Sequence, residues 1–218
     1  MKICIYGAGA IGGYLGVQLA RAGVDVSLVA RGAHLAAMRA NGLKLLIGEE
    51  ERVVHPRCTD NPAELGPQDY VIICLKRALH HRRDRAQMQP LLGPQTRIVT
   101  AVNGISLLVL LQAWRRLSGS ALESIDPGGR QWRELMPQRA IGCIVYPATE
   151  IEAPGVIRHV YGDRFPLGEP SGETTADVQR LSDAFVKAGM QAPMPRSHPR
   201  RDLAQTVGQC LPQPGSAH

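Results

Sequence analysis

The feature that most constrains the fold of this chain is a glycine-rich loop that directly follows a short apolar strand. Residues 2–6 read KICIY, and the next six are Gly7-Ala8-Gly9-Ala10-Ile11-Gly12. From Ala10 to Ala22 apolar side chains recur at helical spacing, and Gly23 is placed to end that helix. A second apolar strand over 24–30 completes the order and size of a βαβ unit.

The loop has the pattern GxGxxG, a weak signal alone that gains meaning from its position between a strand and a helix. In that setting Gly7 permits the tight turn, Gly9 lets the backbone approach a pyrophosphate, and Gly12 lets the helix pack on the strand. The helix N-terminus also offers unpaired N–H groups to phosphates. The segment predicts dinucleotide binding; the alternative is a glycine-rich turn that holds no ligand.

The residue after the second strand favours one dinucleotide over another. An enzyme selective for NAD usually carries Asp or Glu there to bind the ribose hydroxyls, whereas this chain has Arg31. A guanidinium can pair with a 2′-phosphate, so the position favours NADP. The other interpretation of Arg31 is an exposed arginine at the end of a strand.

Two more polar positions follow apolar strands of the kind found in parallel sheets. Lys76 comes directly after the strand over 69–75, and Asn103 follows the strand over 97–101. Ligands of such sheets bind at the carboxyl ends of the strands, so both are candidate site residues. Judged by spacing alone, a solvated lysine and an Asn-Gly turn are the simpler explanations.

The remaining pattern predicts an α/β fold with a Rossmann-like domain and a mainly parallel sheet over residues 1–195. Further expected elements are a helix over 33–41, a hairpin or irregular strands over 43–54, strands over 140–146, 156–161 and 164–167, turns at Pro154-Gly155 and Glu169-Pro170, and a helix over 177–188 closed by Gly189. Residues 196–218 show no sustained period, and we expect them to form an aberrant, disordered tail.

Composition narrows the class of protein. No apolar run is long enough to cross a membrane, and the N-terminus does not resemble a signal peptide. The five cysteines are scattered without CxxC spacing: Cys4, Cys58, Cys74, Cys143 and Cys210. Three of them lie inside apolar runs, which predicts buried thiols in a reducing cytoplasm. The net charge is +6, but the basic clusters at 80–85 and 198–201 lack interleaved aromatic residues, so we expect no nucleic-acid partner. Adjacent His80 and His81 have no partners at metal-ligand spacing, and no metal site is expected.

Taken together, several segments resemble the ketopantoate reductase (2-dehydropantoate 2-reductase) family in both order and spacing. They are KICIYGAGAIGG, LVARG, DYVIICLK, TAVNG, IGCIVYP, APGVIRH and LGEP, and the resemblance covers most of residues 1–194. It implies an NADPH-dependent reduction of ketopantoate, or a similar small α-keto acid, to the 2-hydroxy acid of pantothenate biosynthesis. It leaves the oligomeric state open.

Carried over residue by residue, the resemblance implies a set of cofactor contacts. Gly7, Ala8, Gly9, Ala10, Ile11 and Gly12 would cradle the pyrophosphate, and Arg31 would meet the 2′-phosphate. Lys76 would lie near the cofactor, Asn103 would touch the nicotinamide ribose or the substrate, and Ala148 is a weaker candidate for a cofactor contact.

The family also has a C-terminal all-helical domain, which we expect to be missing here. That domain opens with a segment like EIWLKLWGN, whose lysine donates the proton, whereas residues 200–214 read RRDLAQTVGQCLPQP. No residue of this chain is therefore assigned a catalytic role. We expect NADP binding with little turnover, and the alternative function is a non-catalytic NADP-binding module or a degenerate gene product.

Our hypothesis for these departures from the family pattern is a frameshift. Back-translated with GC-rich codons and read one base later, residues 200–214 give AEIWLKLWGNVCLN. The same offset gives HSITGAIA from residues 78–86 and PCWYFYKHGGA from 106–117, and these three patches coincide with arginine clusters and missing aromatics. The alternative is ordinary divergence of loops and tail.

Sequencing the coding DNA across the three patches tests the frameshift. We expect one-base insertions or deletions relative to an intact homologue, and an open frame for a helical domain in the shifted reading. An unambiguous read without such changes would favour divergence.

Overall fold

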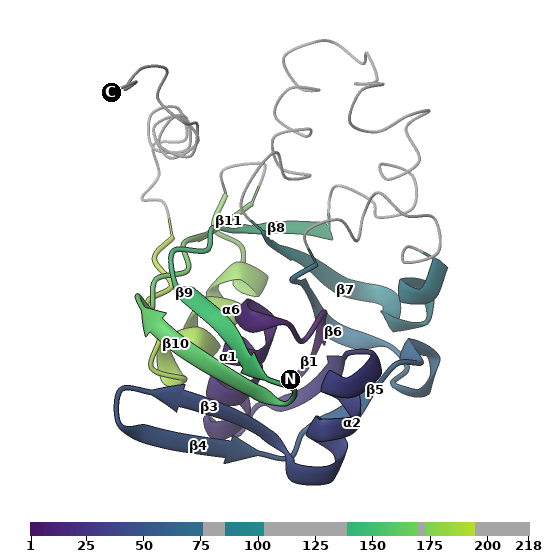
Figure 1. The fold of residues 1–218 in the computed structure, drawn as a ribbon. Coiled ribbons are helices and arrows are strands. Elements are labelled where there is room, and N and C mark those ends of the chain that lie inside the picture. The colour runs from purple at the N-terminus through teal and green to yellow at the C-terminus, as the bar shows by residue number, and fades with distance from the viewer. Residues whose placement is uncertain (76–85, 103–138, 170–172, 195–218) are drawn as a thin grey trace, which may run out of the picture.

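The computed structural model describes residues 1–75, 86–102, 139–169 and 173–194, which form two sheets with helices packed on them (Figure 1). The larger sheet has the strand order β11-β8-β7-β6-β1-β2-β5. Its strands are β1 (Lys2–Tyr6), β2 (Asp25–Val29), β5 (Arg57–Thr59), β6 (Gln68–Ile73), β7 (Leu92–Ala101), β8 (Ala140–Cys143) and β11 (Leu167–Gly168). Neighbouring strands are parallel except β11 and β8, so the predicted α/β fold with a mainly parallel sheet is confirmed.

The smaller sheet joins two hairpins that lie far apart in the sequence. Its order is β4-β3-β10-β9, and its strands are β3 (Leu43–Ile47), β4 (Glu50–Val54), β9 (Ala148–Ala153) and β10 (Val156–Tyr161). The β3–β4 and β9–β10 pairs are antiparallel, whereas β3 and β10 pair in parallel. The hairpin expected over 43–54 is confirmed, and the predicted Pro154-Gly155 turn connects β9 to β10.

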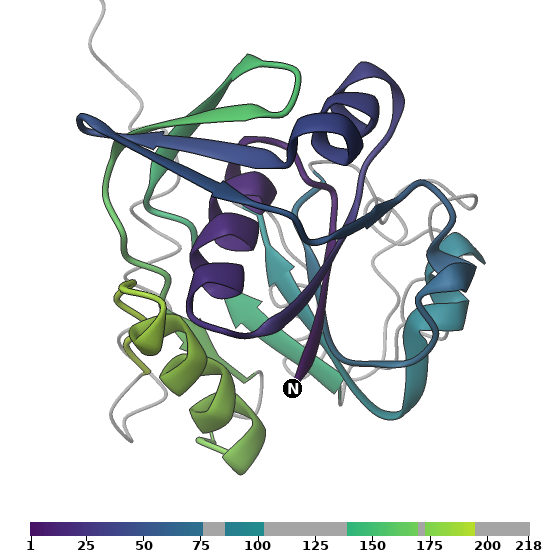
Figure 2. The same ribbon diagram turned by 90° about the horizontal axis from the view of Figure 1, so that it is seen from below.

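Helix α1 (Ala10–Arg21) lies between the two sheets, as the view from below makes clear (Figure 2). Two glycines allow it to approach both. A Cβ atom on Gly16 would lie 2.9 Å from the Leu28 side chain of β2, and one on Gly13 would lie 2.6 Å from Ile157 of β10. Real Cβ contacts are longer, so a larger residue at either position would force the facing side chain, or the helix itself, to move.

The core occupies both faces of the larger sheet. Along β1, Ile3 and Ile5 face the α1 side, while Cys4 and Tyr6 face the other side, and all four side chains are fully buried. β6 is likewise buried over its last four residues. An apolar run buried on both faces is what the pattern over 69–75 predicted.

The thiols agree with the expectation of unpaired, buried cysteines. Cys4 and Cys143 are buried, Cys58 and Cys74 are partly buried, and none of these four forms a disulfide. Burial raises the pKa of Cys4 and of Cys74 to about 12 and that of Cys58 to about 11, and it also raises the pKa of Cys143. These thiols are therefore protonated and poorly nucleophilic near neutral pH.

Several boundaries differ from the sequence-based predictions. The strand expected over 140–146 ends at Cys143, β9 was not predicted, and the strand expected over 164–167 is only β11 plus an isolated bridge from Arg164 to Gln191. The helices were predicted correctly to within one residue: α2 (Gly32–Asn41) and α6 (Ala176–Lys187).

Short 3-10 helices span Pro62–Glu64 and Gln89–Leu91. The tail over 196–218 and the basic clusters at 80–85 and 198–201 lie outside the described residues.

Helix α6 is fixed to the larger sheet by a partly buried polar network. Arg97 of β7 donates from Nε to Asp177 (2.6 Å) and from Nη2 to Glu169 (3.1 Å). The Tyr70 hydroxyl of β6 donates to the Asp177 carbonyl oxygen at 2.8 Å, and Arg180 also contacts the Asp177 carboxylate. Burial opposes ionisation of Asp177, but hydrogen bonds from Arg180 and Arg97 outweigh it and lower the pKa of this carboxyl group.

We expect Asp177→Asn to lower the free energy of unfolding at pH 7 by about 1–2 kcal/mol, a value reduced for the partial exposure of the pair. Because the pKa of Asp177 lies below its ordinary value of 3.8, its contribution is present above that pH and is lost as the pH falls further. Urea unfolding at pH 7 and pH 3 measures both effects, with a smaller gap from wild type at pH 3.

Asp183→Asn is the matched control on the same helix, because Asp183 is exposed and accepts a hydrogen bond only from Gln179 among the contacts described. It should change stability little at either pH. An equal loss in the two variants would contradict a special role for the network.

Candidate functional site

The glycine loop turns sharply between β1 and α1 and is tied to the end of β2. The backbone N–H groups of Gly7 and Ala8 both donate to the Val29 carbonyl oxygen, at 3.1 and 3.0 Å. Gly7 has a φ of +107°, a conformation that L side chains rarely adopt, and a Cβ there would lie 2.6 Å from the Leu75 side chain. The turn therefore brings the ends of β1, β2 and β6 together at one point.

Gly12 explains why the helix can begin so close to the loop. A Cβ atom at this position would lie 2.1 Å from the Gly7 carbonyl oxygen and 3.0 Å from the Ile5 side chain. Because the nearest obstacle is backbone, it cannot turn aside as a flexible side chain would. Glycine here sets the position of the first turn of α1 relative to the loop.

Gly9 has the opposite surroundings. It is the N-cap residue of α1, and a Cβ atom on it would meet nothing within 4 Å. No side chain caps the helix, and its first turn contains no acidic residue. The N–H groups of that turn and the positive end of the helix dipole thus face an open space, which fits a pyrophosphate.

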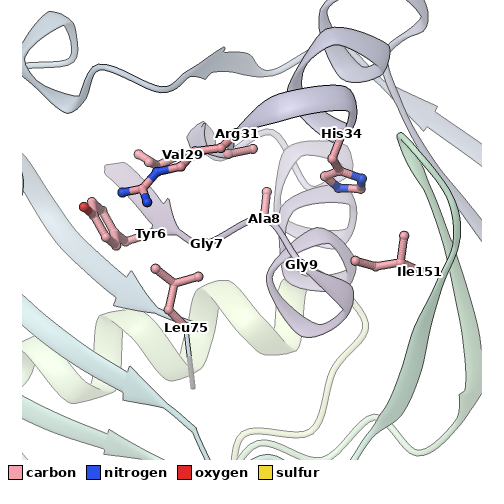
Figure 3. Close-up of a pocket in the computed structure, with 10 residues that line it drawn as sticks. Tyr6, Gly7, Ala8, Gly9, Val29, Arg31, His34, Leu75 and Ile151 are labelled. Carbon is pink, nitrogen blue, oxygen red and sulfur yellow. The ribbon is translucent and has the colours of Figure 1, made fainter. Parts of the chain in front are cut away.

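This open space belongs to a pocket of about 240 Å³ at the carboxyl ends of β1 and β2 (Figure 3). Its lining residues are Tyr6, Gly7, Ala8, Gly9, Val29, Ala30, Arg31, His34, Leu75 and Ile151. The set is mainly apolar and contains two side chains with nitrogen donors. In open parallel sheets, ligands bind in a crevice of this kind.

Arg31 and His34 lie on opposite sides of the pocket, with the glycine loop between them (Figure 3). Arg31 is the N-cap residue of α2, and its guanidinium donates to Gln87 Oε1 at 2.9 Å. His34 follows in the first turn of α2 and accepts a hydrogen bond at Nδ1 from the Gly155 N–H, at 3.0 Å.

The structure brings together part of the predicted site. Gly7, Ala8, Gly9 and Arg31 line the pocket, while Ala10, Ile11 and Gly12 form the first turn of α1 behind it. Ala148 begins β9 and pairs with Tyr161; it is not among the lining residues, and β9 contributes Ile151 instead. Lys76 and Asn103 lie outside the described residues, although Leu75, directly before Lys76, lines the pocket.

Six lining residues were not predicted as site residues: Tyr6, Val29, Ala30, His34, Leu75 and Ile151. Five of them are strand or strand-end residues that carried no local signal of a ligand. His34 had one: it lies three positions after Arg31, so it occupies the first turn of the helix that follows the cofactor-selecting position.

Other kinds of site have no support in the described part of the chain. It contains no group of three or more His, Cys, Asp and Glu side chains able to hold a metal ion. Among its helices, none has the length and apolar character needed to span a membrane.

The contrast between Gly9 and Gly12 can be tested with two alanine variants. We expect Gly12→Ala to lower the free energy of unfolding by about 1–3 kcal/mol, because its Cβ meets immovable backbone. Gly9→Ala should leave stability within about 0.5 kcal/mol of wild type yet weaken NADPH binding, because its methyl group enters the open space. Urea unfolding and fluorescence titration with NADPH measure the two effects. Wild-type affinity in a folded Gly9→Ala protein would contradict a close approach of the ligand at this point.

Comparisons with known proteins agree with this geometry. The family model described as ketopantoate reductase PanE/ApbA matches residues 3–172. The 2-dehydropantoate 2-reductase of Mesorhizobium japonicum is 51% identical over 196 residues, which cover 89% of this chain and 60% of that protein.

Two solved structures extend the comparison. A putative ketopantoate reductase from Ralstonia solanacearum has a TM-score of 0.82 and 36% identity, covering 93% of this chain and 63% of its own. The 2-dehydropantoate 2-reductase from Porphyromonas gingivalis has a TM-score of 0.74 and 31% identity, covering 91% and 65%. The chain thus spans about 60–65% of the length of these relatives. Since the family model matches most of the sequence, the chain belongs to the ketopantoate reductase PanE/ApbA family.

Proposed function

We propose that this chain is the cofactor-binding part of a reductase that uses NADPH to convert 2-dehydropantoate, or a similar α-keto acid, to the 2-hydroxy acid. The observation that carries the proposal is the combination of an uncapped helix N-terminus at Gly9 with a cation, Arg31, at the end of the next strand of the same pocket. Relatives bearing the name 2-dehydropantoate 2-reductase support the choice of substrate class.

Different described residues bind different phosphate groups of the cofactor. The N–H groups of the first turn of α1 hold the pyrophosphate, and Arg31 pairs with the 2′-phosphate. Gln87 accepts a hydrogen bond from the Arg31 guanidinium and so helps to position that side chain. When bound, the cofactor supplies the hydride that reduces the carbonyl carbon.

The substrate side of the site rests on residues outside the described part of the chain. We propose that Lys76 lies near the cofactor and that Asn103 contacts the nicotinamide ribose or the substrate, as the family resemblance implies. The family assigns proton donation to a lysine, and the matching segment here, residues 200–214, reads RRDLAQTVGQCLPQP. General acids typically contribute about 10²–10⁴-fold to rate, so we expect the 218-residue polypeptide to bind NADPH but to turn over slowly.

The cytoplasm is the compartment that best suits this function. The four described thiols are unpaired, which is typical of a reducing environment. A small α-keto acid is the proposed partner.

Cofactor selectivity tests the proposal through Arg31. We expect the wild-type chain to bind NADPH more tightly than NADH, because only NADPH carries the 2′-phosphate. Arg31→Ala should weaken NADPH binding about tenfold or more, since a hydrogen bond between charged groups contributes about 1.5–3 kcal/mol, and should change NADH binding little. Fluorescence titration or calorimetry with the two cofactors provides the measurement.

Arg39→Ala is the matched control, because Arg39 belongs to the same helix but donates to the Cys58 carbonyl oxygen, away from the pocket lining. It should leave both affinities unchanged. Equal affinity of the wild type for NADPH and NADH, or an equal loss of both in Arg31→Ala, would refute the assigned role.

A further inference from the structure

His34 connects α2 to the turn between β9 and β10. The turn residue Gly155 has a φ of +78°, and a Cβ on it would lie 3.0 Å from the Ala37 Cβ, so it approaches α2 more closely than a larger residue could. At this distance the Gly155 N–H donates to Nδ1 of His34 at 3.0 Å. The contact fixes the imidazole ring between the helix and the hairpin.

This contact also determines where the ring carries its proton. A neutral imidazole has one N–H donor and one acceptor nitrogen. Because Nδ1 accepts from Gly155, the proton belongs on Nε2. His34 thus presents a fixed N–H donor at Nε2.

That donor has no acceptor in the described part of the chain. Nε2 of His34 is buried and without a hydrogen-bond partner there. A buried donor left unpaired is unfavourable, and native proteins rarely retain one without a purpose. The ring nevertheless lines the pocket, beside the half-exposed side chain of Ile151 (Figure 3).

The pocket itself indicates what would satisfy the donor. Its lining residues include no Asp or Glu, so no carboxylate of the lining is there to accept from Nε2. The open N-terminus of α1 lies between His34 and Arg31, and all three groups favour negative charge or a hydrogen-bond acceptor. A phosphate oxygen of a dinucleotide meets this requirement.

We propose that His34 donates its Nε2–H to a phosphate oxygen of the bound dinucleotide, with Gly155 setting the tautomer that makes this possible. This inference rests on the proposed function, since it assigns one more binding residue to the same cofactor. It places a donor opposite Arg31, so that the cofactor is held from both sides of the glycine loop. The phosphate is either the pyrophosphate or the 2′-phosphate.

Two substitutions separate the two nitrogens of the ring. His34→Asn retains a side-chain oxygen near the position of Nδ1, able to accept from Gly155, but has no donor at the position of Nε2. His34→Gln extends an amide donor toward that position and loses the acceptor near Gly155. We expect His34→Asn to bind NADP⁺ about tenfold more weakly than wild type, as for a lost hydrogen bond to a charged group, and His34→Gln to recover part of that loss. Calorimetry measures affinity, and thermal unfolding checks that both variants are folded.

Parallel titrations with NAD⁺ identify the phosphate. An equal loss with both cofactors in His34→Asn assigns the bond to the pyrophosphate, and a loss with NADP⁺ alone assigns it to the 2′-phosphate. If wild type binds neither cofactor, the proposed function fails together with this inference. If wild type binds NADP⁺ and a folded His34→Asn binds it equally well, only the role of His34 is refuted.

Nitrogen NMR of the histidine-labelled wild-type protein gives a second readout that needs no substitution. We expect the free protein to show His34 in the Nε2–H form and the Nε2 resonance to shift when NADP⁺ is added. The proposal would be overturned if the free ring carried its proton on Nδ1, or if the chemical shift of Nε2 stayed unchanged at saturating NADP⁺.

Discussion

The close approach of α1 to its surroundings is the constraint on which the rest of the structure depends. At Gly16 the helix touches the larger sheet, at Gly13 it touches the smaller one, and at Gly12 its first turn rests against the loop that precedes it. Packing alone would explain the first two. The contact at Gly12 also sets the position of the uncapped helix N-terminus beside the pocket, so the same close packing that builds the core also shapes the proposed phosphate site. Core and site therefore share their determinants, and variation at these glycines would affect both.

Much of the N-terminal half could be predicted from the sequence because its signals are local. The apolar run of β1, the glycine loop and the helical period of α1 lie within a few turns of chain, and each agrees with the others. β9 could not be predicted in this way. Its sequence, ATEIEA, contains two glutamates, and most of the strand is exposed, so it lacks both apolar alternation and a buried run. It is a strand because it pairs with β10, and that pairing depends on the tertiary structure.

The candidate site also contains residues that local sequence signals predict and residues that only the tertiary structure brings to the pocket. The glycine loop and Arg31 were predictable, since both belong to one βαβ unit whose spacing carries the chemistry. The contact between His34 and Gly155 joins segments that are distant in sequence, so no periodicity in the sequence predicts it. The Arg97 network is similar, because Asp177 reaches Arg97 only once α6 has packed on the sheet, and Glu169 reaches it from the residue that follows β11. Sequence patterns predicted the ligand class, and the fold added further residues that line the candidate pocket.

The parallel pairing of β3 with β10 also sets an order in time. During synthesis, β1, α1 and β2 can associate as soon as they emerge, since their contacts are short in sequence. The pairing of Lys44 in β3 with Val156 in β10 requires β10 to have been synthesised, and only then can Gly155 donate its hydrogen bond to His34. The glycine-loop side of the pocket can therefore form before the side that includes Ile151. A nascent chain that ends before β10 lacks the bond between Gly155 and His34, so we expect the proposed nucleotide site to be completed only after translation has passed the hairpin.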